Sequence, residues 1–258
     1  MNQSQLDHLY TWFDGYVEPF LNTDAEGAKN IRLKIEHTQK VCGAMAQLAE
    51  GENLSEAEAR TASAVALLHD IGRFPQYRRW RTFLDRESDN HARLGIDVIR
   101  SENILTDLDR TEQDVITEAI RFHNLLATPA TMTSPTRLHI DLIRDADKLD
   151  IWRVFVELLA QPPEQRASAA LLGLPDCPGM ASGPCIKALA ADTIVRLDTI
   201  NCINDFILLQ ISWVHDLTTA TSRQLLRERG YITTLASHLP DQPDIRAAVA
   251  QAVTSLSA

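Results

Sequence analysis

The sequence predicts an all-α protein. Aromatic residues make up only 6% of the 258 residues, while alanine and leucine are frequent, and this balance favours helices. Apolar residues recur at the three- and four-residue spacing of a helix face, whereas runs that alternate with the two-residue period of a strand are few. The hydrophobic content of 45% and the charged content of 23% are those of an ordinary globular protein with a sizeable core.

Two long helices are predicted near the N-terminus. The first covers about residues 3–21, and the second runs from about 25 to 48. In the second, Val41, Met45 and their neighbours follow His37 at helical spacing, so His37 belongs to a helix with a buried stripe.

The third predicted helix begins at a capping box, in which Ser55 and Glu58 satisfy backbone N–H groups reciprocally. It continues through residues 61–68 and places the adjacent pair His69–Asp70 at its end. Gly72 is interpreted as its terminator, because glycine adopts the left-handed conformation that closes many helices.

The stretch from Arg73 to Asp89 is rich in arginine and aromatic residues and contains Pro75. It is interpreted as a loop with short helical turns. A helix then begins near Asp89 or Asn90 and carries His91.

Two more helices carry candidate site residues. Residues 111–114, Thr-Glu-Gln-Asp, are predicted to cap a helix with His123 on its apolar stripe. Residues 125–136 are rich in Pro, Thr and Ser and are predicted to be a loop. A long helix follows from about 136 to 159, with Asp147 near its middle.

A break is predicted after this helix, at Pro162–Pro163 and in the Gly/Pro-rich stretch 173–184. The remainder, about 185–256, is predicted to form two or three helices separated near Gly230 and near 240–243. The sequence is therefore interpreted as one helical domain over residues 1–258, with a metal-site core at about 30–155 and a C-terminal helical extension.

Composition restricts the partners and the compartment. A net charge of −10 argues against binding a nucleic acid polymer, although a small nucleotide needs only a local basic cluster. The N-terminus lacks a basic region followed by an apolar core, and the most apolar run, Phe206–Val214, is far shorter than the ~20 residues of a membrane span. We expect a cytoplasmic protein with no membrane partner. Four cysteines without a C-x-x-C pair are expected to be reduced thiols: Cys42, Cys177, Cys185 and Cys202.

Six residues of metal-ligand type lie at helix ends or on inward stripes, in the order His, His-Asp, His, His, Asp. Imidazole and carboxylate together suit Mn, Fe, Co, Ni or Zn, and Mg where carboxylates dominate. We expect divalent ions as cofactors. The candidate ligands are His37, His69, Asp70, His91, His123 and Asp147.

The adjacency of His69 and Asp70 points to two ions. Neighbouring helical side chains point about 100° apart, so one ion could hardly use both. Two ions about 3.5–4 Å apart can be bridged by a carboxylate. His37, His69, Asp70 and Asp147 suffice for one ion, and the remaining two histidines complete a second, with Asp70 shared.

The pattern resembles the HD-domain superfamily of metal-dependent phosphohydrolases. The resemblance rests on His37, on His69-Asp70-Ile-Gly72 and on Asp147 within Arg144-Asp-Ala-Asp-Lys-Leu-Asp150. It covers about residues 30–155 and implies a helical bundle in which these four positions bind the first metal. His91 and His123 look like the extra ligands of the two-metal subgroup.

The sequence departs from some subgroups of that family. No Gly-Tyr-Pro signature follows the doublet, as it does in cyclic-di-GMP phosphodiesterases of the HD-GYP type, and no synthetase domain accompanies it. The segment Gly72-Arg-Phe-Pro-Gln-Tyr77 is similar to that of small bacterial HD proteins. The resemblance therefore implies a reaction class, with a nucleotide or another small phosphorylated metabolite as substrate.

The expected mechanism is attack on phosphorus by a metal-bridging hydroxide, with Asp70 holding the ions. Arginine and lysine side chains would offset charge on the phosphoryl oxygens. Arg73, nearest the doublet, and Lys148 are the main candidates. The further candidates, which an ordinary solvated charge run would also explain, are Arg78, Arg79 and Arg81.

Several alternatives stay open at this point. Asp145 competes with Asp147, but two residues separate the side chains by about 200° on a helix, so only one faces the site. A di-iron centre that activates O₂ would use the same ligands, and a non-catalytic sensor or scaffold is a third function. The remaining histidines are interpreted as structural: His8, His139, His215 and His238.

Overall fold

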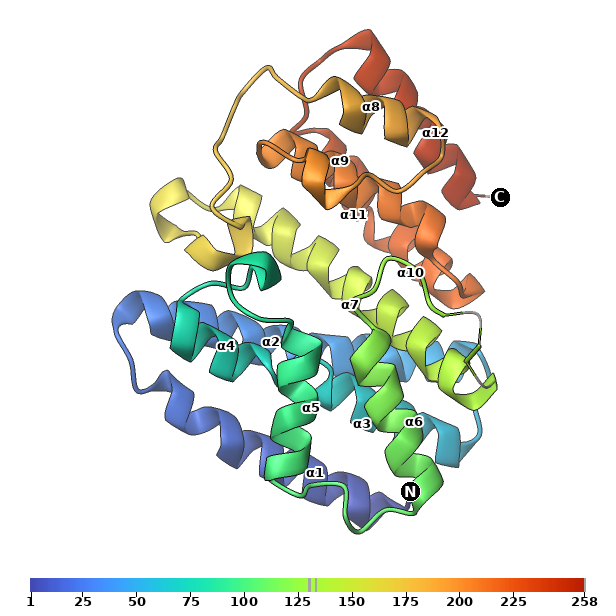
Figure 1. The fold of residues 1–258 in the computed structure, drawn as a ribbon. Coiled ribbons are helices and arrows are strands. Elements are labelled where there is room, and N and C mark those ends of the chain that lie inside the picture. The colour runs from blue at the N-terminus through green and yellow to red at the C-terminus, as the bar shows by residue number, and fades with distance from the viewer. Residues whose placement is uncertain (130, 133, 258) are drawn as a thin grey trace. The chain divides into compact units, whose positions relative to one another are not determined.

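The computed structural model describes residues 1–129, 131–132 and 134–257, and across them the regular structure is helical, which confirms the all-α prediction. Figure 1 shows the helices in chain order. The predicted loop at 125–136 includes positions 130 and 133, which lie outside the described residues. The α-helices are α1 (Gln3–Val17), α2 (Ala25–Gly51), α3 (Glu56–Leu68), α4 (Arg73–Trp80), α5 (His91–Ser101), α6 (Arg110–Phe122), α7 (Ser134–Ala160), α8 (Gly183–Ala190), α9 (Ile203–Ser212), α10 (Ala220–Arg229), α11 (Tyr231–Ala236) and α12 (Pro243–Ser257).

The contacts of the chain divide it into two compact units. The first contains Met1–Asp150 and Ala167–Leu172, and the second contains Ile151–Arg166 and Gly173–Ala258. Helix α7 runs from one into the other. The single domain expected from the sequence stays a prediction, and each unit is described here by itself.

The first unit is built on the long helix α2, which packs along α3, while α6 packs on α3 and α5 packs on α6. The α2 stripe of Val41, Met45 and Leu48 is fully buried. Its start is fixed by Asp24, whose carboxylate accepts the Gly27 N–H at 2.7 Å. Burial of this continuous stripe, more than intrinsic propensity, stabilises such a helix.

The predicted capping box is confirmed at the start of α3, where Ser55 and Glu58 satisfy each other's backbone N–H groups. For α6 the predicted cap is wrong by two residues. Asp109 accepts the Glu112 N–H at 2.9 Å, and Thr111 already lies inside the helix. Asp and Thr are both residue types that cap helices, so either position could begin the helix. The carboxylate of Asp109 also places negative charge at the positive end of the helix dipole.

The prediction of a loop with short turns at 73–89 is wrong for its first half, where residues 73–80 form the regular helix α4. Pro75 is compatible with it because it lies in the first turn, where an N–H has no partner within the helix. The second half contains only the short 3-10 helix η2 (Asp85–Glu87).

The second unit contains more helices than the two or three predicted, namely α8 to α12. All ten residues of α9 are buried, which confirms the buried helix predicted over most of 206–214. The buried carboxylate of Asp205 accepts the backbone N–H and the hydroxyl of Ser182, each at 2.6 Å, and so holds the start of α8. The predicted separator Gly230 ends α10 with φ 66°.

No helix among the described residues is both long enough and apolar enough to cross a membrane.

Gly72 has a different role from the helix terminator expected. Its φ of −70° is helical, so no left-handed residue is needed there. A Cβ at Gly72 would overlap the carbonyl oxygen of His91 and the amide nitrogen of Gly95. Glycine is thus required because the first turns of α5 press against the chain directly after Asp70.

We expect Gly72→Ala to lower the free energy of unfolding by at least about 2 kcal/mol, since overpacking against backbone cannot be relieved by a rotamer change. Gly43→Ala is the matched control, because Gly43 lies in α2 and a Cβ added there would meet nothing within 4 Å. Alanine at that position should stabilise by up to about 1 kcal/mol. Urea unfolding of the two variants measures both effects. Equal stability of the two variants would contradict the close approach.

Candidate metal centre

The first unit brings all six predicted ligands together from five helices. His37 comes from the middle of α2, and Asp147 comes from α7. The other four come from helix ends, since His69 caps the end of α3 and is followed by Asp70, His91 begins α5, and His123 caps the end of α6. Five of the six are buried, and Asp147, with a side-chain exposure of 20%, is the member nearest to solvent.

Each of the four histidines has its Nδ1 engaged by an oxygen. His69 Nδ1 donates to the Ala66 carbonyl and His123 Nδ1 to the Ile120 carbonyl, both at 2.7 Å and both three residues back in their own helices. The same local device thus orients two rings at two helix ends.

Carboxylates hold the other two rings. His37 Nδ1 donates to Asp150 at 2.7 Å, and His91 Nδ1 donates to Asp85 at 2.8 Å. Carbonyl and carboxylate oxygens only accept hydrogen bonds, so in the neutral rings the proton sits on Nδ1. Each Nε2 then presents a lone pair, as a metal ligand must.

The four Nε2 atoms converge on Asp70 in two pairs. Asp70 Oδ2 lies 3.6 Å from His37 Nε2 and 3.7 Å from His69 Nε2. Asp70 Oδ1 lies 3.5 Å from His91 Nε2 and 4.0 Å from His123 Nε2. Asp147 joins the first pair, with its Oδ1 3.1 Å from His37 Nε2.

Divalent ions fit this set of donors. The Nε2 atoms of His37 and His69 are buried without a hydrogen-bond partner, and those of His91 and His123 face each other at 3.2 Å. Two lone pairs at that distance repel unless a proton or a cation lies between them. Two groups each bring three ligand atoms within 4.8 Å of one another, and the two groups share Asp70. We call the group of His37, His69 and Asp70, with Asp147, the first metal position, and the group of Asp70, His91 and His123 the second.

Neighbouring charges keep the carboxylates ionised. Burial alone would raise the pKa of Asp70, but Lys34, with its Nζ 2.6 Å from Oδ2, and further charges including Arg73 hold that pKa well below its usual value. The pKa of Asp147 is also lowered, because His37, whose Nε2 lies 3.1 Å from Asp147 Oδ1, and His69 outweigh burial. Both groups are therefore ready to bind cations at neutral pH.

Burial sets the direction of the pKa shift in three of the four histidines, and His37 is the exception. It lowers the pKa of His91 to about 4, aided by Arg73, and the pKa of His123 to about 4, aided by His69. The pKa of His69 is lowered for the same reason. For His37, burial and Lys34 lower the pKa, but the nearby carboxylates of Asp147 and Asp150 outweigh them and raise it.

The metal-free protein should therefore lose stability on acidification. The unfolded histidines take up protons near pH 6.5, whereas His91 and His123 in the folded state do so only near 4. The unfolded state binds more protons between these values, so the stability is complete above about 6.5 and falls as the pH drops towards 4. We expect a loss of about 3 kcal/mol for each ring over that range. Urea unfolding in EDTA from pH 7 to 4.5 measures it, and a flat profile would contradict the buried neutral rings.

Three residues next to the centre were not predicted, namely Lys34, Asp85 and Asp150. Asp150 and Lys34 each lie three residues from a predicted ligand on the same helix, Asp147 and His37 respectively, and this i,i+3 spacing is the signal that could have found them. Asp85 follows α4 in an irregular segment and carries no such spacing.

The predicted phosphate-binding cations differ in where they lie. Arg73 contacts the centre, with Nε 3.3 Å from Asp70 Oδ1. The side chains of Arg78, Arg79 and Arg81 are engaged elsewhere, by the Phe20 ring, the Trp80 ring and the Asp24 carboxylate respectively. Lys148 is buried, and its Nζ donates to the Arg144 carbonyl at 3.3 Å.

Further residues that the sequence analysis considered lie away from the six ligands or are buried. Of the two rival carboxylates on α7, Asp147 lies against the histidines, and Asp145 is fully buried. Among the remaining histidines, His139 Nδ1 bonds the Pro135 carbonyl and His215 Nε2 lies 3.4 Å from Asp192. The four cysteines are free thiols.

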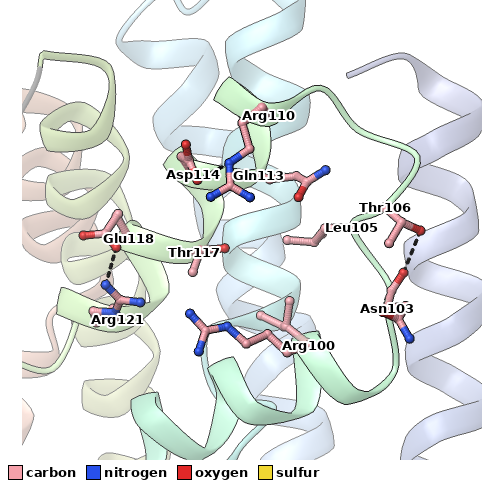
Figure 2. Close-up of a pocket in the computed structure, with 11 residues that line it drawn as sticks. Arg100, Asn103, Leu105, Thr106, Arg110, Gln113, Asp114, Thr117, Glu118 and Arg121 are labelled. Carbon is pink, nitrogen blue, oxygen red and sulfur yellow. Dashed lines mark hydrogen bonds and ion pairs between the residues drawn. The ribbon is translucent and has the colours of Figure 1, made fainter.

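A pocket of about 400 Å³ lies on the α5–α6 side of the first unit (Figure 2). Its lining contains none of the six candidate ligands. Two of its three arginines pair with acids of the same helix, Arg110 with Asp114 and Arg121 with Glu118. The pocket is thus separate from the centre and is largely balanced in charge.

The fold and the site define an all-α protein with a buried histidine and aspartate centre suited to divalent ions. Residues 35–152 match the family model of the HD domain. This match spans all six candidate ligands and confirms the resemblance to the HD-domain superfamily over this part of the chain. Searches of curated proteins and of solved structures gave no match.

Proposed function

We propose that this protein hydrolyses a phosphoester of a nucleotide or another small phosphorylated metabolite, using two divalent ions. The observation that carries the proposal is the position of the Asp70 carboxylate. Each of its two oxygens faces a different pair of histidine Nε2 atoms. A carboxylate placed between two sets of ligands is the arrangement that bridges a pair of ions in phosphohydrolysis.

The residues would divide the work as follows. His37, His69, Asp70 and Asp147 would hold one ion, and His91 and His123 would hold the other with Asp70. When bound, the ions would act as Lewis acids that lower the pKa of water and offset charge on the phosphoryl group.

Two cations at the edge of the centre would help to bind the phosphate. Lys34 and Arg73 each have a side-chain exposure of 16%, so both lie at the border between the buried ligands and solvent. Each donates one hydrogen bond to Asp70. The Nη1 group of Arg73 also donates to Asp85, so the Nη2 group of Arg73 and the Nζ group of Lys34 would donate to phosphoryl oxygens. Positive charge there stabilises the charge that develops in the transition state. Lys148, which the sequence also suggested, lies deeper and keeps the role of a candidate only.

A small substrate suits the chain better than a polymer. The net charge of −10 repels an extended polyanion, whereas a single phosphate group needs only the local cations at the centre. Asp147, the most exposed of the six ligands, marks the side from which such a group would reach the ions.

The test is a panel of phosphomonoesters, phosphodiesters and nucleotides, assayed after removal of bound metal and addition of Mn²⁺, Co²⁺, Zn²⁺ or Mg²⁺ one at a time. We expect hydrolysis that depends on added metal, that proceeds without O₂, and that EDTA abolishes. The same ligands would also suit a di-iron centre that activates O₂. Iron-specific absorption with O₂ consumption, and no hydrolysis of any member of the panel, would establish that alternative and overturn the proposal.

A further inference from the structure

Asp85 lies directly behind His91, on the side of the ring that faces away from Asp70. Its Oδ1 and Oδ2 lie 2.9 and 2.8 Å from His91 Nδ1. Because the carboxylate accepts only, it fixes the proton on Nδ1 and leaves Nε2 to face Asp70 Oδ1 at 3.5 Å. Asp85 therefore selects the form of His91 that can bind a metal.

The other neighbours of this carboxylate are donors too. Asp85 Oδ1 accepts from Arg73 Nη1 at 3.1 Å and from Gln76 Nε2 at 2.8 Å, and Oδ2 accepts from Asn124 Nδ2 at 3.4 Å. Gln76 is itself fully buried, and its amide nitrogen also donates to the hydroxyl of Ser88 at 2.9 Å. A buried amide held at two points keeps the carboxylate in one place.

Arg73 connects this carboxylate back to the centre. Its Nη1 donates to Asp85 while its Nε lies 3.3 Å from Asp70 Oδ1. Since His91 Nε2 faces the same oxygen of Asp70, the four side chains of Asp70, Arg73, Asp85 and His91 close a ring of polar contacts around one edge of the second metal position.

We propose that Asp85 is the positioning residue of the second metal position. It sets the tautomer and the orientation of His91, and it holds Arg73 against Asp70. The affinity for the second ion then depends on Asp85. The affinity for the first ion depends on Asp150, which holds His37 in the same way at 2.7 Å. This inference rests on the two-ion centre of the proposed function and on no choice of substrate.

Replacement by asparagine keeps the shape and removes the charge. In Asp85→Asn, one carboxylate oxygen becomes an NH₂ group. The present partners of the carboxylate are all donors, namely His91, Arg73, Gln76 and Asn124. At least one hydrogen bond must therefore become a contact between two donors. Loss of such a partner behind a metal-binding histidine reduces metal affinity about 10- to 100-fold.

The experiment titrates Zn²⁺ alone into metal-stripped protein and follows it by calorimetry and by ¹⁵N NMR of the histidine rings. The NMR signals identify which ring nitrogens bind the ion. The variants are Asp85→Asn, Asp150→Asn and, as the matched control, Asp89→Asn. Asp89 lies in the same segment and has a side-chain exposure of 31%, against 32% for Asp85, but its carboxylate bonds Arg93.

We expect Asp85→Asn to weaken the binding reported by His91 and His123 about 10- to 100-fold and to leave the binding reported by His37 and His69 unchanged. Asp150→Asn should do the reverse, and Asp89→Asn should match the wild type. Two unchanged Zn²⁺ sites in Asp85→Asn would overturn the inference and leave the proposed function standing. A wild-type protein that binds one Zn²⁺ through His37 and His69 only would overturn both.

The wild-type protein gives a second, independent readout if a variant does not fold. In the metal-free state, the ring of His91 should carry its proton on Nδ1, with a coupling to the Asp85 carboxylate. A His91 ring without a proton on Nδ1 would overturn the inference without any variant.

Discussion

Asp70→Ala should abolish both the bound metal and the phosphoester hydrolysis. It removes the carboxylate that faces all four Nε2 atoms and that accepts hydrogen bonds from Lys34 and Arg73. Without this negative charge, the two cations at the centre repel a divalent ion. Since the proposed hydrolysis would depend on the ions, we expect a loss of at least about 1000-fold in kcat/KM.

Metal analysis by mass spectrometry and the hydrolysis assay measure the two effects separately. Asp141→Ala is the control, because Asp141 is a carboxylate on α7 that pairs with Arg137 outside the centre. Retention of the wild-type metal content together with full activity in Asp70→Ala would contradict the assignment of Asp70.

Removal of metal should destabilise the protein more than most single substitutions do. The centre packs four histidines and two aspartates in the interior of the first unit, and ligand groups of this kind gain their full complement of bonds only with the ions. At a free metal concentration about 100 times the Kd, each ion stabilises the folded state by about 2.7 kcal/mol. For a chain of this size, each such increment corresponds to a rise in Tm of about 5–10 °C.

Thermal unfolding in EDTA and in Mn²⁺ measures this rise. The signal should come from a probe in the first unit, because all the candidate ligands lie in Met1–Asp150. Asp70→Ala should show the same Tm in both buffers. An equal Tm for the wild-type protein with and without Mn²⁺ would argue that the cluster is not a metal centre.

Much of the first unit could be predicted because its signals are local. The capping box of Ser55 and Glu58 and the stripe of α2 lie within a few residues of the structure that they determine. Helix α4 was not predicted, because Pro75 and a polar, arginine-rich composition resemble a loop until the tertiary structure places the proline in a first turn. The short helices α8 to α12 gave weak periodic signals, since six to fifteen residues span few turns.

The candidate ligands followed from the order and context of the His and Asp residues, whereas the groups around them did not. Lys34 contacts Asp70 across 36 residues of sequence, and Asn124 contacts Asp85 across 39. Such contacts depend on how α2, α5 and α6 pack against one another, and no local pattern encodes that packing. Gly72 is a further example. Its place after the His-Asp doublet suggested a helix terminator, whereas the structure requires glycine there because the backbone of α5 lies too close for a Cβ.

We propose above that Asp70 joins two ions within one centre. The most direct test is electron paramagnetic resonance of the protein loaded with two equivalents of Mn²⁺. Two ions bridged by one carboxylate, about 3.5–4 Å apart, are coupled to each other, so we expect an exchange-coupled spectrum that is absent from Asp70→Ala. A spectrum of isolated Mn²⁺ at full loading would contradict it.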